Sequence, residues 1–113
     1  MPRHFVRTTM AVASVLLAAL VLPSGLRAQT DTAKIYKTNC ALCHAPDGSG
    51  NTSAGKALGA KDLRSQEVQA KSDSDLTLTI TKGKGKMPAF SGKLKPDEIK
   101  QMITYIRDLA KPK

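Results

Sequence analysis

The sequence predicts an all-α domain of about four short helices, and three observations lead to that prediction. Residues 96–110 repeat apolar side chains at helical spacing, and two earlier segments, residues 31–39 and 72–82, carry helix start and stop signals. Pro, Gly and Ser gather in three stretches, residues 45–55, 83–88 and 91–96, which is typical of loops. The sequence has no internal repeat, so one helical domain accounts for it.

The last predicted helix is the clearest. Pro96 suits the first helical turn, where a backbone N–H has no partner within the helix. Asp97 and Glu98 place negative charge at the positive end of the helix dipole. One face is apolar, which predicts a helix buried on one side, and its members are Ile99, Met102, Ile103, Ile106, Leu109 and Ala110.

The segment before Cys40 is the first predicted helix. Residues 31–39 are mostly good helix formers, and Thr30 or Asp31 can serve as the N-cap. Ile35 and Tyr36 fall on one side of this helix. A further short helix is expected within residues 61–69.

Residues 72–82 give conflicting signals. Leu76, Leu78 and Ile80 alternate with threonine as they would in a strand, whereas Ser72 and Gly83 resemble a helix N-cap and a helix stop. A lone strand would leave its backbone N–H and C=O groups without partners, because no other segment alternates in this way. We therefore expect a helix here.

The first 28 residues have the pattern of a cleaved secretory signal. Arg3 and Arg7 form a positive start, residues 10–22 form an apolar run, and Ala28 provides a small residue for cleavage. The run is shorter than the roughly 20 residues of a membrane-spanning helix, although an uncleaved anchor stays open as an alternative. We expect export to the bacterial periplasm and a mature domain over residues 29–113.

The chain is basic, with 18 Lys and Arg residues against 9 Asp and Glu. It stays basic without the arginines of the signal, so acidic protein surfaces are the expected partners. Nucleic acid is excluded as a partner, because the lysines are not interleaved with aromatic residues and no binding motif is present. At most peripheral association with a membrane is expected, and the domain is expected to be a monomer.

The segment Cys40-Ala41-Leu42-Cys43-His44 is the attachment signature of a c-type haem. Two thiols separated by two residues can reach the two vinyl groups of one haem, and the adjacent histidine then lies against the iron. A covalent haem c would also supply apolar area to a small domain that has no Trp. A redox disulfide would lack its usual βαβ surroundings, and a structural zinc site usually takes four protein ligands.

The second iron ligand is expected to be a methionine sulfur. Cleavage removes His4 and leaves His44 as the last histidine, so the mature chain offers Met87 and Met102. Met102 lies on the apolar face of the last helix, where methionine usually fills the core. Met87 lies in the loop over residues 83–88, whose glycines and proline let the backbone approach the haem. We expect His44 and Met87 to bind the iron, with an open sixth position as the alternative.

These residues resemble the class I cytochromes c, especially the small bacterial and photosynthetic forms, over essentially all of the mature chain. The resemblance implies helices wrapped around one covalently attached haem, with the first and last helices crossing at Tyr36, Met102 and Tyr105. Further matching pieces are Asp47-Gly48-Ser49-Gly50, Gly55 and Leu58, Met87-Pro88-Ala89-Phe90 and Tyr105-Ile106.

Two positions depart from the family pattern. Lys56 stands where the family usually has a proline whose carbonyl accepts the N–H of the haem histidine, and a main-chain carbonyl near Lys56 is expected to take that role. Thr32 stands where a glycine commonly lets the two helices cross. The fold is expected to accommodate both changes.

The expected function is single-electron transfer between redox enzymes, without catalysis. Similarity to the family and a six-coordinate iron both imply a carrier that serves a dehydrogenase, a cytochrome complex or a terminal oxidase. The alternatives are a haem subunit fixed to a larger dehydrogenase or oxidase, and a cytochrome whose Met87 leaves the iron to admit peroxide or a gas. The haem is expected among Leu58, Leu63, Leu76, Ile80, Phe90 and Ile106.

Five lysines flank the proposed methionine loop, and they form either a solvated surface or a docking ring for acidic partners. They are Lys82, Lys84, Lys86, Lys93 and Lys95.

Overall fold

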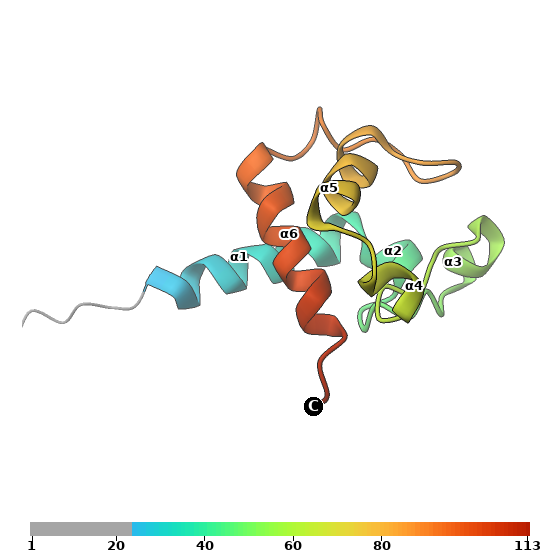
Figure 1. Ribbon diagram of the computed structural model, residues 1–113, viewed down its shortest axis with the longest axis horizontal. Coiled ribbons are helices and arrows are strands. Elements are labelled where there is room, and N and C mark those ends of the chain that lie inside the picture. The colour runs from blue at the N-terminus through green and yellow to red at the C-terminus, as the bar shows by residue number, and fades with distance from the viewer. Residues whose placement is uncertain (1–23) are drawn as a thin grey trace, which may run out of the picture.

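A computed structural model describes residues 24–113 of the chain (Figure 1). This part forms the helices α1 (Ser24–Asn39), α2 (Ala41–His44), α3 (Ser53–Leu58), α4 (Gln66–Gln69), α5 (Asp73–Lys82) and α6 (Pro96–Leu109). Between residues 24 and 113 there is no β-strand, and an isolated backbone bridge joins Lys84 to Met87. The prediction of an all-α fold is confirmed.

Helix α1 begins at Ser24, seven residues before the predicted start at residue 31. Helix formers such as Leu26 and Ala28 carry the helix back into that segment. Among the described side chains of α1, Thr32 is the first that is buried, so the part that packs agrees with the prediction. The predicted secretory signal lies, as far as residue 23, outside the described residues, and its cleavage stays a prediction.

The crossing of α1 and α6 is the central contact of the fold (Figure 1). Tyr36 of α1 and Met102 of α6 are the most deeply buried large side chains, with 2% and 1% of their surface exposed. The rings of Tyr36 and Tyr105 lie 4.9 Å apart between centroids, at an angle of 37°. Thr32 is also buried, and its hydroxyl donates to the Gln101 side-chain oxygen at 2.9 Å. The expected aromatic contact is therefore present, and a threonine is accommodated beside it.

Helix α5 packs along α6 and confirms the choice of helix for residues 72–82. The Ser72 hydroxyl accepts the Asp75 N–H at 3.0 Å, and the helix ends at Gly83, whose φ is +74°. Leu76 and Ile80, four residues apart, are buried, whereas Leu78 is 52% exposed. The apparent strand alternation thus combines one buried helical face with a leucine on the outer face.

Two helices were not predicted from the sequence. Helix α2 is a single turn after Cys40, and α3 takes up residues that the sequence assigned to the loop 45–55. The start signal of α3 is Thr52, whose hydroxyl accepts the Gly55 N–H at 2.8 Å. Its end signal is Gly59, which has a left-handed φ of +71°. Each of these helix-capping signals is a single residue, and the many glycines nearby made the segment resemble a loop.

One apolar cluster forms the core. It draws side chains from α1, α4, α5, α6 and from the connections between α3 and α4 and between α5 and α6. Burying a leucine-sized side chain contributes about 1.5–3 kcal/mol, so this cluster provides most of the stabilisation of the polypeptide. Its members are Tyr36, Leu63, Val68, Leu76, Ile80, Phe90, Leu94, Ile99, Met102, Ile103 and Ile106. Within the described part of the chain, no helix is both long enough and apolar enough to cross a membrane.

Arg107, in the last turn of α6, ties this helix to the connection between α4 and α5. Its guanidinium donates to the carbonyl oxygens of Gln69 at 2.9 Å and Lys71 at 2.7 Å. It also donates to the Asp73 carboxylate at 2.8 Å, close to the start of α5. The planar guanidinium therefore holds α6 in place relative to α4 and α5.

We expect Arg107→Leu to lower the free energy of unfolding by about 1–3 kcal/mol, because two backbone carbonyls lose their donors. Arg107→Lys should recover only part of this loss, since an ammonium lacks the planar fork. Denaturant titration followed by circular dichroism measures both effects. Lys111→Leu, which removes the exposed pair with Asp108, is the control and should cost less than about 1 kcal/mol. Equal stability of Arg107→Leu and the unchanged chain would contradict this account.

Candidate functional site

Cys40, Cys43 and His44 lie on one helical turn that directly follows α1. The N–H groups of Cys43 and His44 both donate to the Cys40 carbonyl, at 3.2 and 2.9 Å. Residues three apart on a helical turn face the same side, so the two thiols project together. The turn thus fixes two thiols and an imidazole relative to one another.

The two cysteines are not joined by a disulfide, and both are partly buried. Burial, with a smaller contribution from the neighbouring Cys43, raises the pKa of the Cys40 thiol to about 11. Redox-active C-x-x-C pairs depend on a thiolate of lowered pKa, so this environment disfavours a disulfide oxidoreductase. Between residues 24 and 113, no three His, Cys, Asp or Glu side chains cluster as metal ligands.

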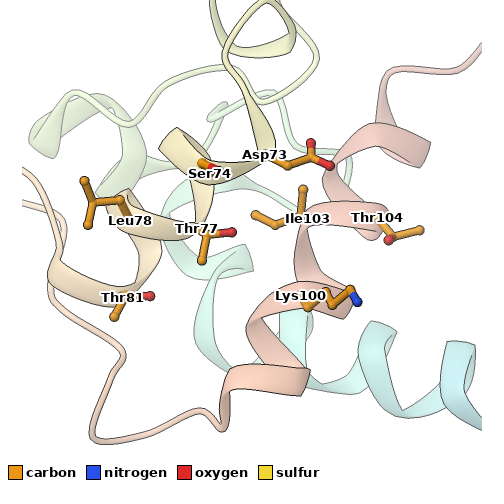
Figure 2. A pocket seen from close by; sticks show the side chains of 8 residues that line it. All are labelled: Asp73, Ser74, Thr77, Leu78, Thr81, Lys100, Ile103 and Thr104. Atoms are coloured by element: carbon orange, nitrogen blue, oxygen red, sulfur yellow. The ribbon is translucent and has the colours of Figure 1, made fainter.

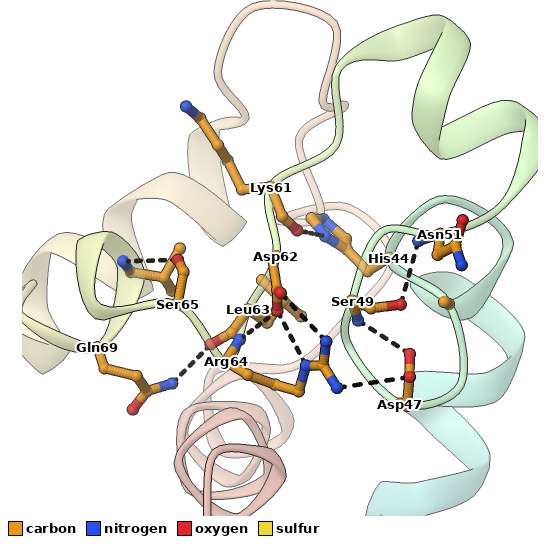
Figure 3. A network of polar contacts seen from close by, with 12 residues as sticks. His44, Asp47, Ser49, Asn51, Lys61, Asp62, Leu63, Arg64, Ser65 and Gln69 are labelled. Carbon is orange, nitrogen blue, oxygen red and sulfur yellow. Dashed lines mark hydrogen bonds and ion pairs between the residues drawn. The ribbon is translucent and has the colours of Figure 1, made fainter.

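The imidazole of His44 is oriented by a backbone carbonyl. His44 Nδ1 lies 2.9 Å from the Lys61 carbonyl oxygen (Figure 3). A carbonyl can only accept, so Nδ1 carries the hydrogen and Nε2 keeps its lone pair for a metal. The expectation of an acceptor near Lys56 is wrong, because Lys56 lies inside α3. The chain turns at Gly59 before it brings the Lys61 carbonyl to the ring.

The loop after His44 is closed by short hydrogen bonds. The Gly50 N–H donates to the His44 carbonyl at 2.8 Å, and the Leu63 N–H donates to the Gly48 carbonyl at 2.7 Å. Within the loop the Ser49 N–H donates to the Asp47 carboxylate at 3.0 Å (Figure 3). These bonds hold the backbone on both sides of the imidazole.

Arg64 connects the loop after His44 with the segment that carries Lys61 (Figure 3). Its guanidinium lies 3.1 Å from the Asp62 carboxylate and 3.6 Å from the Asp47 carboxylate. The hydrogen bond from Arg64 lowers the pKa of Asp62, and the hydrogen bond from Ser49 does the same for the pKa of Asp47. Both carboxylates reach solvent, so these ion pairs contribute little to stability. Their effect is to hold the two segments beside each other.

Helix α3 is held against the cysteine turn by Thr52 and Gly55. The Thr52 hydroxyl donates to the Leu42 carbonyl at 2.7 Å. A Cβ added at Gly55 would lie 2.2 Å from the Cys43 carbonyl oxygen and 2.5 Å from that of Gly50. Only glycine therefore allows this approach of α3 to the attachment turn.

Met87 lies in a tight turn after α5. The N–H and carbonyl groups of Lys84 and Met87 bond to each other at 3.1 and 3.0 Å. A Cβ at Gly83 would lie 2.5 Å from the Met87 carbonyl oxygen, and Gly85 has a φ of +58°. The two glycines thus make the turn possible, as the sequence predicts.

Met87 and the cysteine turn pack against the same apolar cluster. Met87, Cys40 and Ala41 are partly buried and pack against this cluster. Met102 is 1% exposed within the cluster itself, beside Tyr36 at the helix crossing. Met102 is therefore a core residue, and Met87 is the methionine with a partly accessible side chain.

The predicted apolar surroundings of the haem are buried with one exception. Leu63, Leu76, Ile80, Phe90 and Ile106 all belong to the cluster. Leu58 lies at the end of the short helix α3 and is 45% exposed on the polypeptide, so its contact with the haem stays a prediction. Sequence reasoning missed Leu42, which is 77% exposed. Its position between the two cysteines was the available signal.

The described residues fit a covalently attached haem. Two unpaired thiols lie on one turn, the adjacent imidazole has its Nε2 lone pair available, and a methionine turn packs against the same apolar cluster. Imidazole and thioether are donors that haem iron takes in such sites.

A separate groove of about 480 Å³ lies between α5 and α6 (Figure 2). None of Cys40, Cys43, His44 and Met87 lines it, so it is distinct from the attachment turn. Its walls carry hydroxyl groups around an apolar floor, from Asp73, Ser74, Thr77, Leu78, Thr81, Lys100, Ile103 and Thr104.

Comparison with known proteins gives a consistent set of relatives. Residues 27–106 match the family described as cytochrome C oxidase, cbb3-type, subunit III. Cytochrome c6 of Leptolyngbya boryana is 36% identical over 80 residues, which are 68% of this chain and 87% of that protein. Cytochrome c6 of Anabaena variabilis is 42% identical over 79 residues, with 66% and 83% covered. The solved c-type cytochrome KustC0563 superposes with a TM-score of 0.65 at 34% identity, over 71% of this chain and 98% of that one.

We expect Gly55→Ala to lower the free energy of unfolding by about 3 kcal/mol, because its Cβ would collide with two backbone carbonyls. The same change should reduce the fraction of chains that carry haem, since α3 can no longer pack against the cysteine turn. Thermal unfolding and absorbance at the haem band measure the two effects. Gly92→Ala is the matched control, because a Cβ at Gly92 meets no atom within 4 Å. A Gly55→Ala protein that behaves like Gly92→Ala would disprove the close approach.

Proposed function

Because the chain belongs to the small monohaem class I cytochromes c, which carry electrons with a covalent haem c, we propose that it shuttles single electrons between redox enzymes in the bacterial periplasm. It is an electron carrier and not an enzyme. The observation that carries the proposal is the turn that holds two unpaired thiols beside an imidazole whose Nε2 is available for a metal.

The haem is attached through Cys40 and Cys43. Cys40 and Cys43 would each hold the haem through one thioether, formed by addition of the thiol S–H across a vinyl group. Burial raises the pKa of the Cys40 thiol, so in this structure it is held as a neutral thiol. Both sulfurs project from one turn, which suits the two vinyl groups of a single ring.

His44 and Met87 bind the iron. The hydrogen bond from Nδ1 to the Lys61 carbonyl fixes the ring tautomer and increases the electron donation of Nε2. When bound, the haem supplies a one-electron ferric–ferrous couple, and a thioether ligand favours the ferrous form. If His44 and Met87 both hold the iron, no position would be left for a substrate, which suits a carrier.

The apolar cluster sets the surroundings of the site. Phe90, Leu76 and Ile80 are buried in the cluster against which Met87 packs, so this cluster would present an apolar surface to the haem. A dry environment disfavours additional positive charge, so these side chains also favour the ferrous state. The same rigid packing limits rearrangement when the charge changes.

Acidic surfaces of redox proteins are the proposed partners. The lysines that flank the Met87 turn lie at the surface, and Lys93 lies 5.8 Å from the centre of the Phe90 ring. A basic rim of this kind steers a carrier toward an acidic partner and keeps the complex short-lived. The secretory pattern of residues 1–28 supports a periplasmic location.

A second candidate is a haem subunit of a terminal oxidase. The family that matches residues 27–106 is described as a subunit of a cbb3-type oxidase. Purification under mild conditions separates the two functions, because a subunit would elute in fixed stoichiometry with an oxidase and a shuttle would elute alone.

We expect the unchanged protein to show a sulfur-to-iron charge-transfer band and Met87→Ala to lose it. The potential should fall by on the order of 100 mV or more in Met87→Ala, because the thioether that favours ferrous iron is gone. An optical spectrum and a redox titration measure both changes. Met102→Leu is the control and should keep the band, since Met102 belongs to the core.

Extraction with acidified acetone tests the attachment in the same samples. Haem bonded through Cys40 and Cys43 stays with the precipitated protein, whereas coordinated haem enters the solvent. A band that persists in Met87→Ala would assign the sulfur ligand to another residue, and a colourless protein would refute the proposed function.

We expect Lys84→Glu combined with Lys86→Glu to slow oxidation by ferricyanide about tenfold at low salt, because the anionic oxidant loses its attraction to the rim. Oxidation by a cationic cobalt complex should accelerate instead. Stopped-flow kinetics at several ionic strengths measure the rates. The control is Lys34→Glu with Lys37→Glu, which changes the net charge equally at exposed positions of α1, outside the Met87 turn. Equal effects of the two pairs would show that net charge alone matters.

A further inference from the structure

Ala45, directly after His44, has a backbone conformation that suits glycine. Its φ is +64° and its ψ is 159°, and between residues 24 and 113 it is the one non-glycine residue with a positive φ. This region is essentially reserved for glycine, because a Cβ meets the neighbouring peptide groups there. Ala45 is also buried, with 4% of its surface exposed. Such a residue stays in place only when its surroundings hold it.

The side chain that holds Ala45 is Tyr36. The Tyr36 hydroxyl donates to the Ala45 carbonyl oxygen at 2.7 Å, and both groups are buried. The Gly48 N–H donates to the same oxygen at 3.1 Å. Burial raises the pKa of Tyr36, so the hydroxyl keeps its proton and remains a donor.

Tyr36 makes a hydrogen bond at each end of the cysteine turn. Its backbone carbonyl accepts the Cys40 N–H at 2.8 Å, just before the turn, while its hydroxyl holds Ala45 just after the turn. Its ring is fixed against Tyr105 at the crossing of α1 and α6. The position of the hydroxyl is therefore set by the packing of two helices and not by a mobile side chain.

We propose that Tyr36 is a positioning residue for His44, which holds the strained backbone of Ala45 and thereby sets the direction of the imidazole. The inference rests on the proposed role of His44 as an iron ligand. Lys61 fixes the ring from the side through Nδ1, and the Gly50 N–H fixes the His44 carbonyl. Tyr36 supplies the remaining constraint, on the carbonyl of Ala45, one peptide further along the chain from His44.

Without the hydroxyl, Ala45 can relax toward a negative φ. That rotation turns the peptide between His44 and Ala45 and moves the imidazole away from the Lys61 carbonyl. Strain at Ala45 is what drives the movement, so the role of Tyr36 depends on the residue at position 45. A glycine there is comfortable at a positive φ and needs no such support.

The experiment compares Tyr36→Phe, Ala45→Gly and the double variant in the haem-bearing protein. NMR follows exchange of the His44 Nδ1 hydrogen with solvent, and a redox titration follows the iron. We expect Tyr36→Phe to accelerate the exchange about fivefold to tenfold, the worth of one hydrogen bond, and to shift the equilibrium constant for reduction about threefold. In the Ala45→Gly background, the same substitution should change both quantities less than about twofold.

Tyr105→Phe is the matched control. It removes a hydroxyl from the partner ring of the aromatic pair, and that hydroxyl does not contact Ala45 or His44 through a hydrogen bond within residues 24–113. It should leave the exchange of the His44 Nδ1 hydrogen and the potential unchanged. A purely structural role of Tyr36 would lower stability but leave the potential unmoved. Equal effects of Tyr36→Phe in the unchanged chain and in the Ala45→Gly variant would likewise overturn the proposal.

Two further results have a defined meaning: failure of Tyr36→Phe to take up haem, and an iron that is not bound by His44. If Tyr36→Phe does not take up haem, recovery of haem in the double variant supports the proposal and continued failure overturns it. If the unchanged protein binds haem through sulfur but its iron is not bound by His44, the proposed function fails independently of Tyr36. The optical spectrum of the unchanged protein distinguishes these cases before any variant is made.

Discussion

The structure depends on the crossing of α1 and α6. Tyr36 and Met102 meet there with almost no surface exposed, and Tyr36 lies only four residues before the first cysteine. Because the cysteine turn continues directly from α1, the packing of the crossing sets the position of the thiols and the imidazole. Helix α5 and the Met87 turn then pack on the same apolar cluster. The two proposed iron ligands are thus placed by one core.

Hydrogen bonds fix the orientation of His44 and the position of α3, beyond what the packing of the apolar core provides. His44 is held through its ring by Lys61 and through its backbone by the loop after it, and Thr52 brings α3 against the turn. All of these contacts use backbone carbonyl or N–H groups, which have fixed positions once the helices are packed. A histidine held in this way presents the same ring nitrogen in the same direction, which a ligand to a redox-active iron requires.

The electron-carrier function follows from rigidity at the iron combined with a charged surface. Met87 packs against the apolar cluster, whereas the lysines around the Met87 turn remain accessible to a partner. A carrier needs fast and short-lived encounters, and charges at the rim provide attraction without a large buried interface. The small core also explains the need for a covalent cofactor, because the attached ring adds apolar area that so short a chain cannot supply by itself.

The sequence by itself determined the chemistry, the helices with strong periodicity and the preference for Met87 over Met102, because these depend on residue type and local spacing. It did not determine the carbonyl that orients His44, the single turn α2 or the short helix α3. Tertiary structure decided these, since they depend on how distant segments meet: Gly59 redirects the chain so that Lys61 and not Lys56 reaches the imidazole. The strain at Ala45 was also invisible, because alanine adopts that conformation only when a distant hydroxyl, that of Tyr36, holds it there.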